Sequence, residues 1–177
     1  GITTTGATII TDLDSTPRSM LIWRAMLQWL GGIGIIVIAI AVFPVLRLGG
    51  MQLFKTEFSA RDDKVLPRTK TIALGIGSVY ILLTFVCFIF LVLAGMGIFD
   101  AIAHAMTIIA TGGFSTKNMS IGFYDSVYIE ITTMVFMLIS ALPFLLILQT
   151  FKGRIFELLK NSQVQFFFVT ILTLVFI

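Results

Sequence analysis

Two short segments rich in threonine and glycine contain residues that could coordinate a cation. One reads T-T-T-G-A-T at residues 3–8, and the other reads T-G-G-F-S-T at residues 111–116. A dehydrated K⁺ needs several oxygens in place of its water shell, and rings of backbone carbonyls can supply them. Glycine reaches the backbone angles that turn successive carbonyls inward at low cost, and the hydroxyl groups add further oxygens. Both segments are therefore candidate ion-selectivity filters.

The two segments align with each other through the residues that follow them. An Asp-Ser pair precedes a Met-Leu pair by twelve residues in each copy, from Asp14 to Met26 and from Asp125 to Met137. The second copy has four more residues between its glycine and its Asp-Ser pair. In this register the candidate K⁺-binding residues are Thr4, Thr5, Gly6 and Ala7 in the first copy and Thr111, Gly112, Gly113 and Phe114 in the second. Both filters face one side, so we interpret the copies as parallel repeats around an axis along the membrane normal.

An apolar stretch directly before the second segment has the length of a short helix. Residues 98–110 read I-F-D-A-I-A-H-A-M-T-I-I-A, which suits a helix of about three turns. Asp100 is placed to cap or complement the N-terminus of this helix, and the negative end of the helix dipole would point toward the ion. A helix that returns as extended backbone is a re-entrant loop, which is tolerated only inside protein or beside a water-filled cavity.

The composition indicates that membrane-spanning helices position these segments. The chain is 58% hydrophobic, its mean hydropathy is +1.05, and only 12% of its residues are charged, about half the share in a soluble domain. A membrane helix needs ~20 mostly apolar residues. Uncharged runs occupy Ala25–Leu46, Thr71–Phe99, Ile131–Phe151 and Asn161–Ile177, the last of which the chain end interrupts. We expect an all-α integral membrane protein.

The basic residues indicate the orientation of the chain in the membrane. Nine of the twelve lie in the two connections after the first and third runs: Arg47, Lys55, Arg61, Lys64, Arg68, Lys70, Lys152, Arg154 and Lys160. The positive-inside rule places both connections in the cytoplasm. The net charge of +3 therefore reflects topology. It is not a sign of nucleic-acid binding, because the basic residues lie in short loops next to the apolar runs.

Several motifs resemble the TrkH family, the membrane subunits of bacterial Trk potassium uptake systems within the wider Trk/Ktr/HKT superfamily. They are the two candidate filters, M-L-Q-W-L-G-G-I-G-I-I-V at 26–37, G-G-M-Q-L-F at 49–54 and N-x-S-I-G-F-Y-D-S at 118–126. The resemblance implies helix–pore loop–helix repeats, four of them around one K⁺ pore. The third and fourth filters and the gating loop of the third repeat would lie outside this chain, so the fold here is incomplete.

The resemblance also implies a division of the chain and a set of partners. The division gives the first filter, outer loop and helix at 1–47, a cytoplasmic loop at 48–70, the second repeat at 71–151, a cytoplasmic loop at 152–162, and the start of the third repeat at 163–177. The implied setting is a multi-pass protein of the bacterial inner membrane, a homodimer in the lipid bilayer, with a cytosolic TrkA-like nucleotide-binding regulator. K⁺ is the transported ion and no cofactor is expected. Arg61, Lys64 and Arg68 are the predicted contacts of that regulator.

Two alternatives stay open at this point, and one class of function is excluded. A Na⁺-conducting member of the superfamily would tend to carry serine at a filter glycine, whereas Gly6 and Gly113 favour K⁺. A non-conducting scaffold would explain the helices but not the paired segments. An enzyme is not expected, because the chain has one histidine (His104), one cysteine (Cys87) and no intramembrane acidic pair.

Other residues in the apolar runs have structural interpretations. We expect Gly31, Gly32 and Gly34 to allow close helix packing. Arg24 is expected to reach the surface or to pair near the filter mouth. Pro44 and Pro143 fall late in their helices, where they are expected to produce kinks.

The charge pattern predicts which loops are accessible from each side of the membrane. Residues 56–70 should be cytoplasmic and residues 117–125 extracytoplasmic. Cysteines placed at positions 62 and 120 of the full-length protein can be labelled in intact cells with an impermeant reagent, and only position 120 should react. Labelling of position 62 without position 120 would show that the orientation is wrong.

Overall fold

The computed structural model describes residues 1–50, 65–151 and 155–175, and the regular structure in these ranges is entirely helical. The helices are α1 (Arg18–Gly50), α2 (Val65–Leu93), α3 (Ile98–Ile109), the 3₁₀ helix η3 (Ser120–Tyr124), α4 (Val127–Ser140), α5 (Phe144–Phe151), α6 (Ile155–Lys160) and α7 (Ser162–Val175). The predicted all-α class is confirmed.

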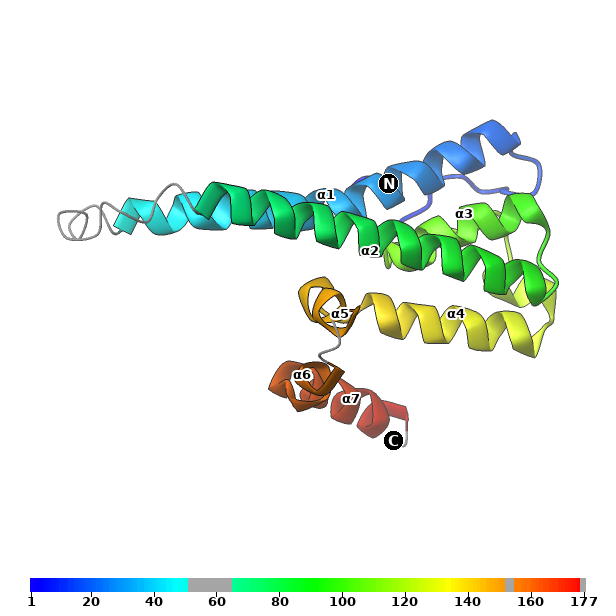
Figure 1. Cartoon of the computed structure of the whole chain (residues 1–177). Coiled ribbons are helices and arrows are strands. Elements are labelled where there is room, and N and C mark those ends of the chain that lie inside the picture. Colours follow the sequence, from blue (N-terminus) through cyan, green and yellow to red (C-terminus); the bar gives the residue numbers. More distant parts are fainter. Residues whose placement is uncertain (51–64, 152–154, 176–177) are drawn as a thin grey trace.

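Two long antiparallel helices, α1 and α2, form one side of the molecule (Figure 1). The 29 residues of α2 correspond to a length of ~44 Å at 1.5 Å per residue, more than the ~30 Å of a hydrocarbon layer. Ala73–Leu93 is an unbroken helical stretch with the length and composition of a membrane span. The bent pair α4 and α5 would provide a second span if it is counted as one.

The short helix α3 lies at the centre of the packing. It contacts α1, α2 and α4, and Ala101, Ala103 and Ala105 are buried on it. Small side chains allow neighbouring helices to approach closely, which is the usual way that helices associate in a membrane. The largest fully buried side chains on the neighbouring helix α2 are Tyr80 and Leu91. The element that precedes the second threonine–glycine segment is therefore fixed from three sides.

The third apolar run differs from its prediction as one continuous crossing. It is broken between α4 and α5, whose axes differ in direction by 97°. Pro143 has no N–H to donate and disfavours helical angles at the preceding residue, and the Ser140 hydroxyl donates to the Phe136 carbonyl at 2.6 Å, a contact that often accompanies helix bending. The effect of Pro143 is therefore a break, whereas α1 continues past Pro44.

The helix bounds also shift the predicted connections. The predicted loop 48–70 narrows because α1 ends at Gly50 and α2 begins at Val65. The predicted loop 152–162 contains α6. The predicted crossing Thr71–Phe99 is shorter than expected, since α2 ends at Leu93 and the last two residues of the run belong to α3. Arg61 and Lys64 lie outside the described residues. The division into repeats stays an interpretation.

The glycines of α1 differ in what surrounds them. A Cβ added at Gly32 would lie 2.7 Å from the Tyr80 hydroxyl oxygen and 3.0 Å from Ala110, so α1 meets α2 and the end of α3 at this point. A Cβ added at Gly31 would overlap the carbonyl of Ile2. A Cβ added at Gly34 would meet no atom of the described residues within 4 Å. The expected close helix packing therefore holds for Gly32, whereas Gly31 meets the non-helical backbone of Ile2.

This difference predicts unequal effects of two matched substitutions. Gly32→Ala should lower the stability of the full-length protein by ~1–3 kcal/mol, the usual range for an overpacked site. Gly34→Ala adds the same methyl group to the same helix in open space and should have little effect. Thermal unfolding in detergent measures both. Equal stability of the two variants would contradict the close approach at Gly32.

Candidate functional site

The two threonine–glycine segments have the same pattern of backbone angles. Thr4 and Thr111 have φ of 53° and 51°, and Gly6 and Gly113 both have φ of 76°. The residues between them, Thr5 and Gly112, are not among those with positive φ. Such alternation turns successive peptide groups toward the same side of the chain. The predicted alignment of Thr4 with Thr111 and of Gly6 with Gly113 agrees with this geometry.

The two segments also lie side by side at the same level of the molecule. A Cβ added at Gly6 would be 2.7 Å from the carbonyl oxygen of Gly112. Further along, the Asn118 side chain accepts from the Leu13 N–H at 2.7 Å and donates to an Asp12 carboxylate oxygen at 2.9 Å. Both segments therefore run in the same direction and end in joined outer loops.

Charge strengthens this junction of the outer loops. Hydrogen bonds from Ser15 and then from Asn118 hold the pKa of Asp12 below its ordinary value of 3.8. The ionised carboxylate therefore persists at neutral pH, and charge-assisted hydrogen bonds are the stronger kind. The Lys117 ammonium lies 3.8 Å from an Asp14 carboxylate oxygen, which adds a second link between the loops.

One face of α3 holds the second segment along its length. The Thr107 hydroxyl donates to the Phe114 carbonyl at 2.8 Å. The His104 Nε2 lies 3.0 Å from the Ser115 hydroxyl, and the Thr116 hydroxyl donates to the Asp100 carboxylate at 2.7 Å. Residues 100, 104 and 107 share a helix face, so the returning chain runs antiparallel to α3. This geometry is the helix and extended return that the sequence predicts.

The hydrogen bonds of His104 indicate its tautomer. Its Nδ1 lies 2.7 Å from the carbonyl oxygen of Asp100, which can only accept, so Nδ1 carries the proton. The Ser115 hydroxyl accepts from the Lys117 N–H at 3.1 Å and can donate its own hydrogen to Nε2. A neutral imidazole thus satisfies every contact, and His104 serves as a support for the returning chain.

The expected capping role of Asp100 is only partly correct. Asp100 lies in the first turn of α3, where a carboxylate complements the helix dipole. The N-cap residue is Gly97, however, and no side chain caps the helix. The carboxylate of Asp100 instead accepts from Thr116, so it joins the start of α3 to the end of the second segment.

Gln28 of α1 supports the second segment from the opposite side. Its Nε2 donates to the Gly112 carbonyl at 2.8 Å, and its Oε1 accepts from the Phe114 N–H at 3.2 Å. Gln28 is fully buried, with 0% of its surface exposed. A buried backbone group left without a partner costs ~1–3 kcal/mol. The single amide group of Gln28 therefore satisfies two backbone groups that flank Gly113.

Arg24 joins the two segments one turn closer to the outer end of α1. Its Nη2 donates to the Thr8 hydroxyl at 2.9 Å, and its guanidinium carbon lies 4.3 Å from the centroid of the Phe114 ring. A guanidinium over an aromatic face is an attractive cation–π arrangement. The expectation that Arg24 pairs near the filter mouth agrees with these contacts.

The eight predicted ion-binding residues fall into two groups. Thr5, Ala7, Thr111 and Gly113 are exposed, and Thr4 and Gly6 are half-buried. Gly112 and Phe114 are buried, and their backbone groups accept hydrogen bonds from Gln28 and Thr107 respectively. The first group faces open space and the second anchors the segment. Ion binding at these positions stays a prediction.

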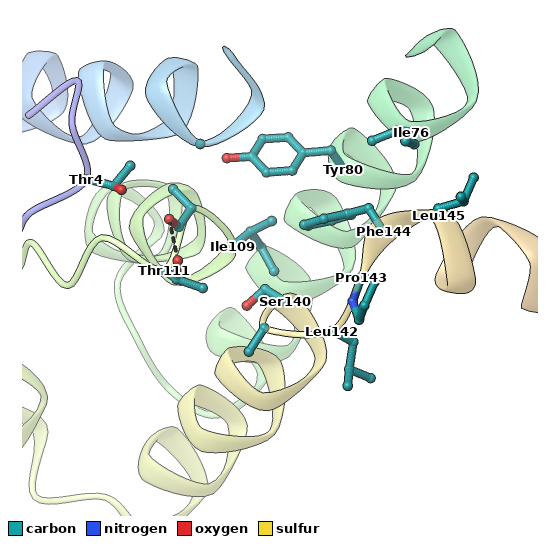
Figure 2. Close-up of a pocket in the computed structure, with 13 residues that line it drawn as sticks. Thr4, Ile76, Tyr80, Ile109, Thr111, Ser140, Leu142, Pro143, Phe144 and Leu145 are labelled. Atoms are coloured by element: carbon teal, nitrogen blue, oxygen red, sulfur yellow. Dashed lines mark hydrogen bonds between the residues drawn. The ribbon is translucent and has the colours of Figure 1, made fainter. Parts of the chain in front are cut away.

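A cavity of about 610 Å³ lies below the two segments (Figure 2). Thr4 and Thr111 line it at one end, and Tyr80, Ser140 and Phe144 line it beside the α4–α5 break. The Ser140 hydroxyl also lies 3.2 Å from the Ile108 carbonyl at the end of α3. The break after α4 therefore leaves an apolar space directly beneath the segments. Across the described ranges, no group of three or more His, Cys, Asp or Glu side chains could hold a metal ion.

Gln28 and the supporting roles of His104 and Thr107 were not predicted from the sequence. One available signal was that Gln28 is the only amide side chain in the apolar run Ala25–Leu46, because a polar group at that depth requires a partner. The second signal was the spacing of Asp100, His104 and Thr107 by four and three residues, which places polar groups on one face of an apolar helix.

Comparison with known proteins gives consistent matches over the whole chain. The TrkH family model, described as a cation transport protein, matches residues 1–177. A Trk system potassium uptake protein TrkH from Escherichia coli K12 is 44% identical over 184 residues, covering 99% of this chain and 38% of that protein. The crystal structure of the potassium transporter TrkH from Vibrio parahaemolyticus superposes with a TM-score of 0.79 at 40% identity, covering 97% of this chain and 34% of that one. The chain thus spans well under half the length of these relatives.

The contacts of α3 predict that Thr107 stabilises the returning segment. Thr107→Val keeps the volume of the side chain but leaves the Phe114 carbonyl without its donor, so the free energy of unfolding should fall by ~1–3 kcal/mol. Thr173→Val is the matched control, because the Thr173 hydroxyl is bonded to Val169 of its own helix. Thermal unfolding of the full-length protein compares them. A loss no larger for Thr107→Val than for the control would contradict the support from α3.

Proposed function

The chain belongs to the TrkH family of cation transport proteins, and from this premise we propose that its two threonine–glycine segments form part of a K⁺-selective pore. The observation that carries the proposal is the shared alternation of backbone angles at Thr4 to Gly6 and Thr111 to Gly113. Two separate segments with one geometry, at one level and in one direction, are suited to contribute equivalent carbonyls to a single ring of oxygens.

The glycines support K⁺ as the ion. Gly6 and Gly113 have φ of 76°, a conformation that glycine adopts without strain and other residues rarely adopt. The Gly112 and Phe114 carbonyls accept hydrogen bonds from Gln28 and Thr107, so the oxygens proposed for the cation in the second segment are the carbonyls of Thr111 and Gly113. The C-terminus of α3 lies directly before Thr111, and the negative end of a helix dipole favours a cation nearby.

The proposed path runs from the joined outer loops through the filter to the cavity beneath it. Asp12 and Asp14 are exposed in the outer loop of the first copy, where acidic groups raise the local concentration of cations. Below the filter, the 610 Å³ cavity is lined mainly by apolar side chains, so a cation there would keep its water shell. Transport of this kind needs no catalytic group.

The complete pore requires more than this chain. The chain covers 38% of the Escherichia coli relative, so K⁺ uptake is proposed for the full-length protein, with further filter segments completing the ring. We place that protein in the bacterial inner membrane as a multi-pass homodimer. As part of a Trk system, it would work with a cytosolic TrkA-like nucleotide-binding regulator.

The filter assignment predicts a loss of selectivity when a side chain is added at either glycine. Gly6→Ser and Gly113→Ser should each strain the backbone by ~1–3 kcal/mol, the usual cost of a disfavoured dihedral. The strained oxygen ring should admit Na⁺ more readily, so the ratio of K⁺ to Na⁺ uptake should fall while the protein still reaches the membrane. Uptake by cells that lack other K⁺ transporters measures this ratio.

Gly34→Ser is the matched control, since a Cβ added at Gly34 would meet no atom of the described residues within 4 Å. It should keep the ratio of the unmodified protein. Unchanged ratios in both filter variants would remove the filter assignment. If the unmodified protein preferred Na⁺, the assignment of a pore would stand, but the transported ion would be Na⁺ and not K⁺.

A further inference from the structure

Gln28 connects two different copies of the repeat. It lies on α1, the helix that follows the first threonine–glycine segment, yet both of its side-chain hydrogen bonds reach the second segment, 84 and 86 residues away. Its side chain has no exposed surface. A Cβ added at Gly112 would lie within 2.7 Å of three atoms of the Gln28 amide, so only glycine leaves room for this contact.

The two hydrogen bonds hold the two peptide groups on either side of Gly113. The Gly112 carbonyl belongs to the peptide before Gly113, and the Phe114 N–H belongs to the peptide after it. Gly113 has positive φ, and a glycine at such a position can rotate to other backbone angles with little resistance. A rigid planar amide that binds both neighbouring peptides fixes these angles, because any rotation at Gly113 would break a buried hydrogen bond.

This support is not repeated in the second copy. The alignment that pairs Met26 with Met137 places Ile139 of α4 at the position of Gln28. Isoleucine has no donor or acceptor in its side chain, so α4 cannot hold a neighbouring segment in the same way. Of the two copies in this chain, only the first has a residue at this position that can make such a contact.

We propose that Gln28 is a positioning residue that sets the ion selectivity of the second filter by fixing the peptides around Gly113. The proposal rests on the proposed K⁺ pore. It differs from a role in packing alone, because a packing residue would affect stability and the amount of protein without changing which ion passes. The hydrogen bonds of the amide, and not its volume, should determine the ratio of K⁺ to Na⁺ uptake.

Two substitutions in the full-length protein separate these roles. Gln28→Met keeps a similar volume and removes both hydrogen bonds. Gln28→Leu also removes both hydrogen bonds, with a slightly smaller side chain. Gln28→Met should lower the ratio of K⁺ to Na⁺ uptake by about tenfold, which corresponds to ~1.4 kcal/mol, and Gln28→Leu should also lower it. Gln28 itself contributes no oxygen to the ion.

Thr84→Val is the matched control. It removes the hydrogen bond that the Trp29 indole N–H donates to the Thr84 hydroxyl. Trp29 follows Gln28 in the sequence, but this bond joins α1 to α2 and does not reach the filter. It should change stability and leave the uptake ratio unchanged. Each variant is compared at equal amounts of protein in the membrane.

The outcomes decide between the two roles. A lower ratio in Gln28→Met, with the ratio of Thr84→Val unchanged, supports the proposal. An unchanged ratio in Gln28→Met, whatever its stability, overturns it, and so does an equal loss in Thr84→Val. If Gln28→Met does not reach the membrane, the ratio of Gln28→Leu decides in the same way. Absence of K⁺ uptake by the unmodified protein would instead count against the proposed function. This failure is distinguishable from a failure of the Gln28 proposal, because it is seen without any variant.

Discussion

Extended backbone inside a helical membrane protein must find hydrogen-bond partners other than water, and this constraint governs the structure around the second segment. A helix satisfies its own peptide groups, but residues 112–116 are not helical. Several of their partners are side chains on two helices. Thr107 binds the Phe114 carbonyl from α3, and Gln28 binds the Gly112 carbonyl from α1. These side chains supply hydrogen-bond partners that the extended segment needs at this depth.

The same constraint explains why the polar residues of the apolar helices lie where they do. Polar side chains in a membrane helix are costly and usually have a partner. Those of α3 point toward the returning segment, while its alanines pack against neighbouring helices. The two copies are also joined directly, through Arg24, which contacts Thr8 and Phe114, and through the hydrogen bond between Asp12 and Asn118. The position of each segment therefore depends on the other copy.

Sequence patterns predicted the parts of the site that depend on local spacing. The short helix before the second segment and the register of Gly6 with Gly113 follow from composition and from the repeated Asp-Ser and Met-Leu pairs, and the backbone angles agree with both. The partner of Gln28 could not be predicted, because it lies more than 80 residues away and only the folded chain brings them together. The break at Pro143 was underestimated, because a proline interrupts a helix to an extent set by the surrounding packing.

The central claim is that the two segments line one ion pathway. Rb⁺ can replace K⁺ in such sites and is located by anomalous diffraction from crystals of the full-length protein grown in its presence. The account predicts anomalous peaks on a common axis beside Thr4 to Gly6 and Thr111 to Gly113, within coordinating distance of backbone carbonyls of both segments. Peaks elsewhere in the molecule, with none between these two segments, would contradict it.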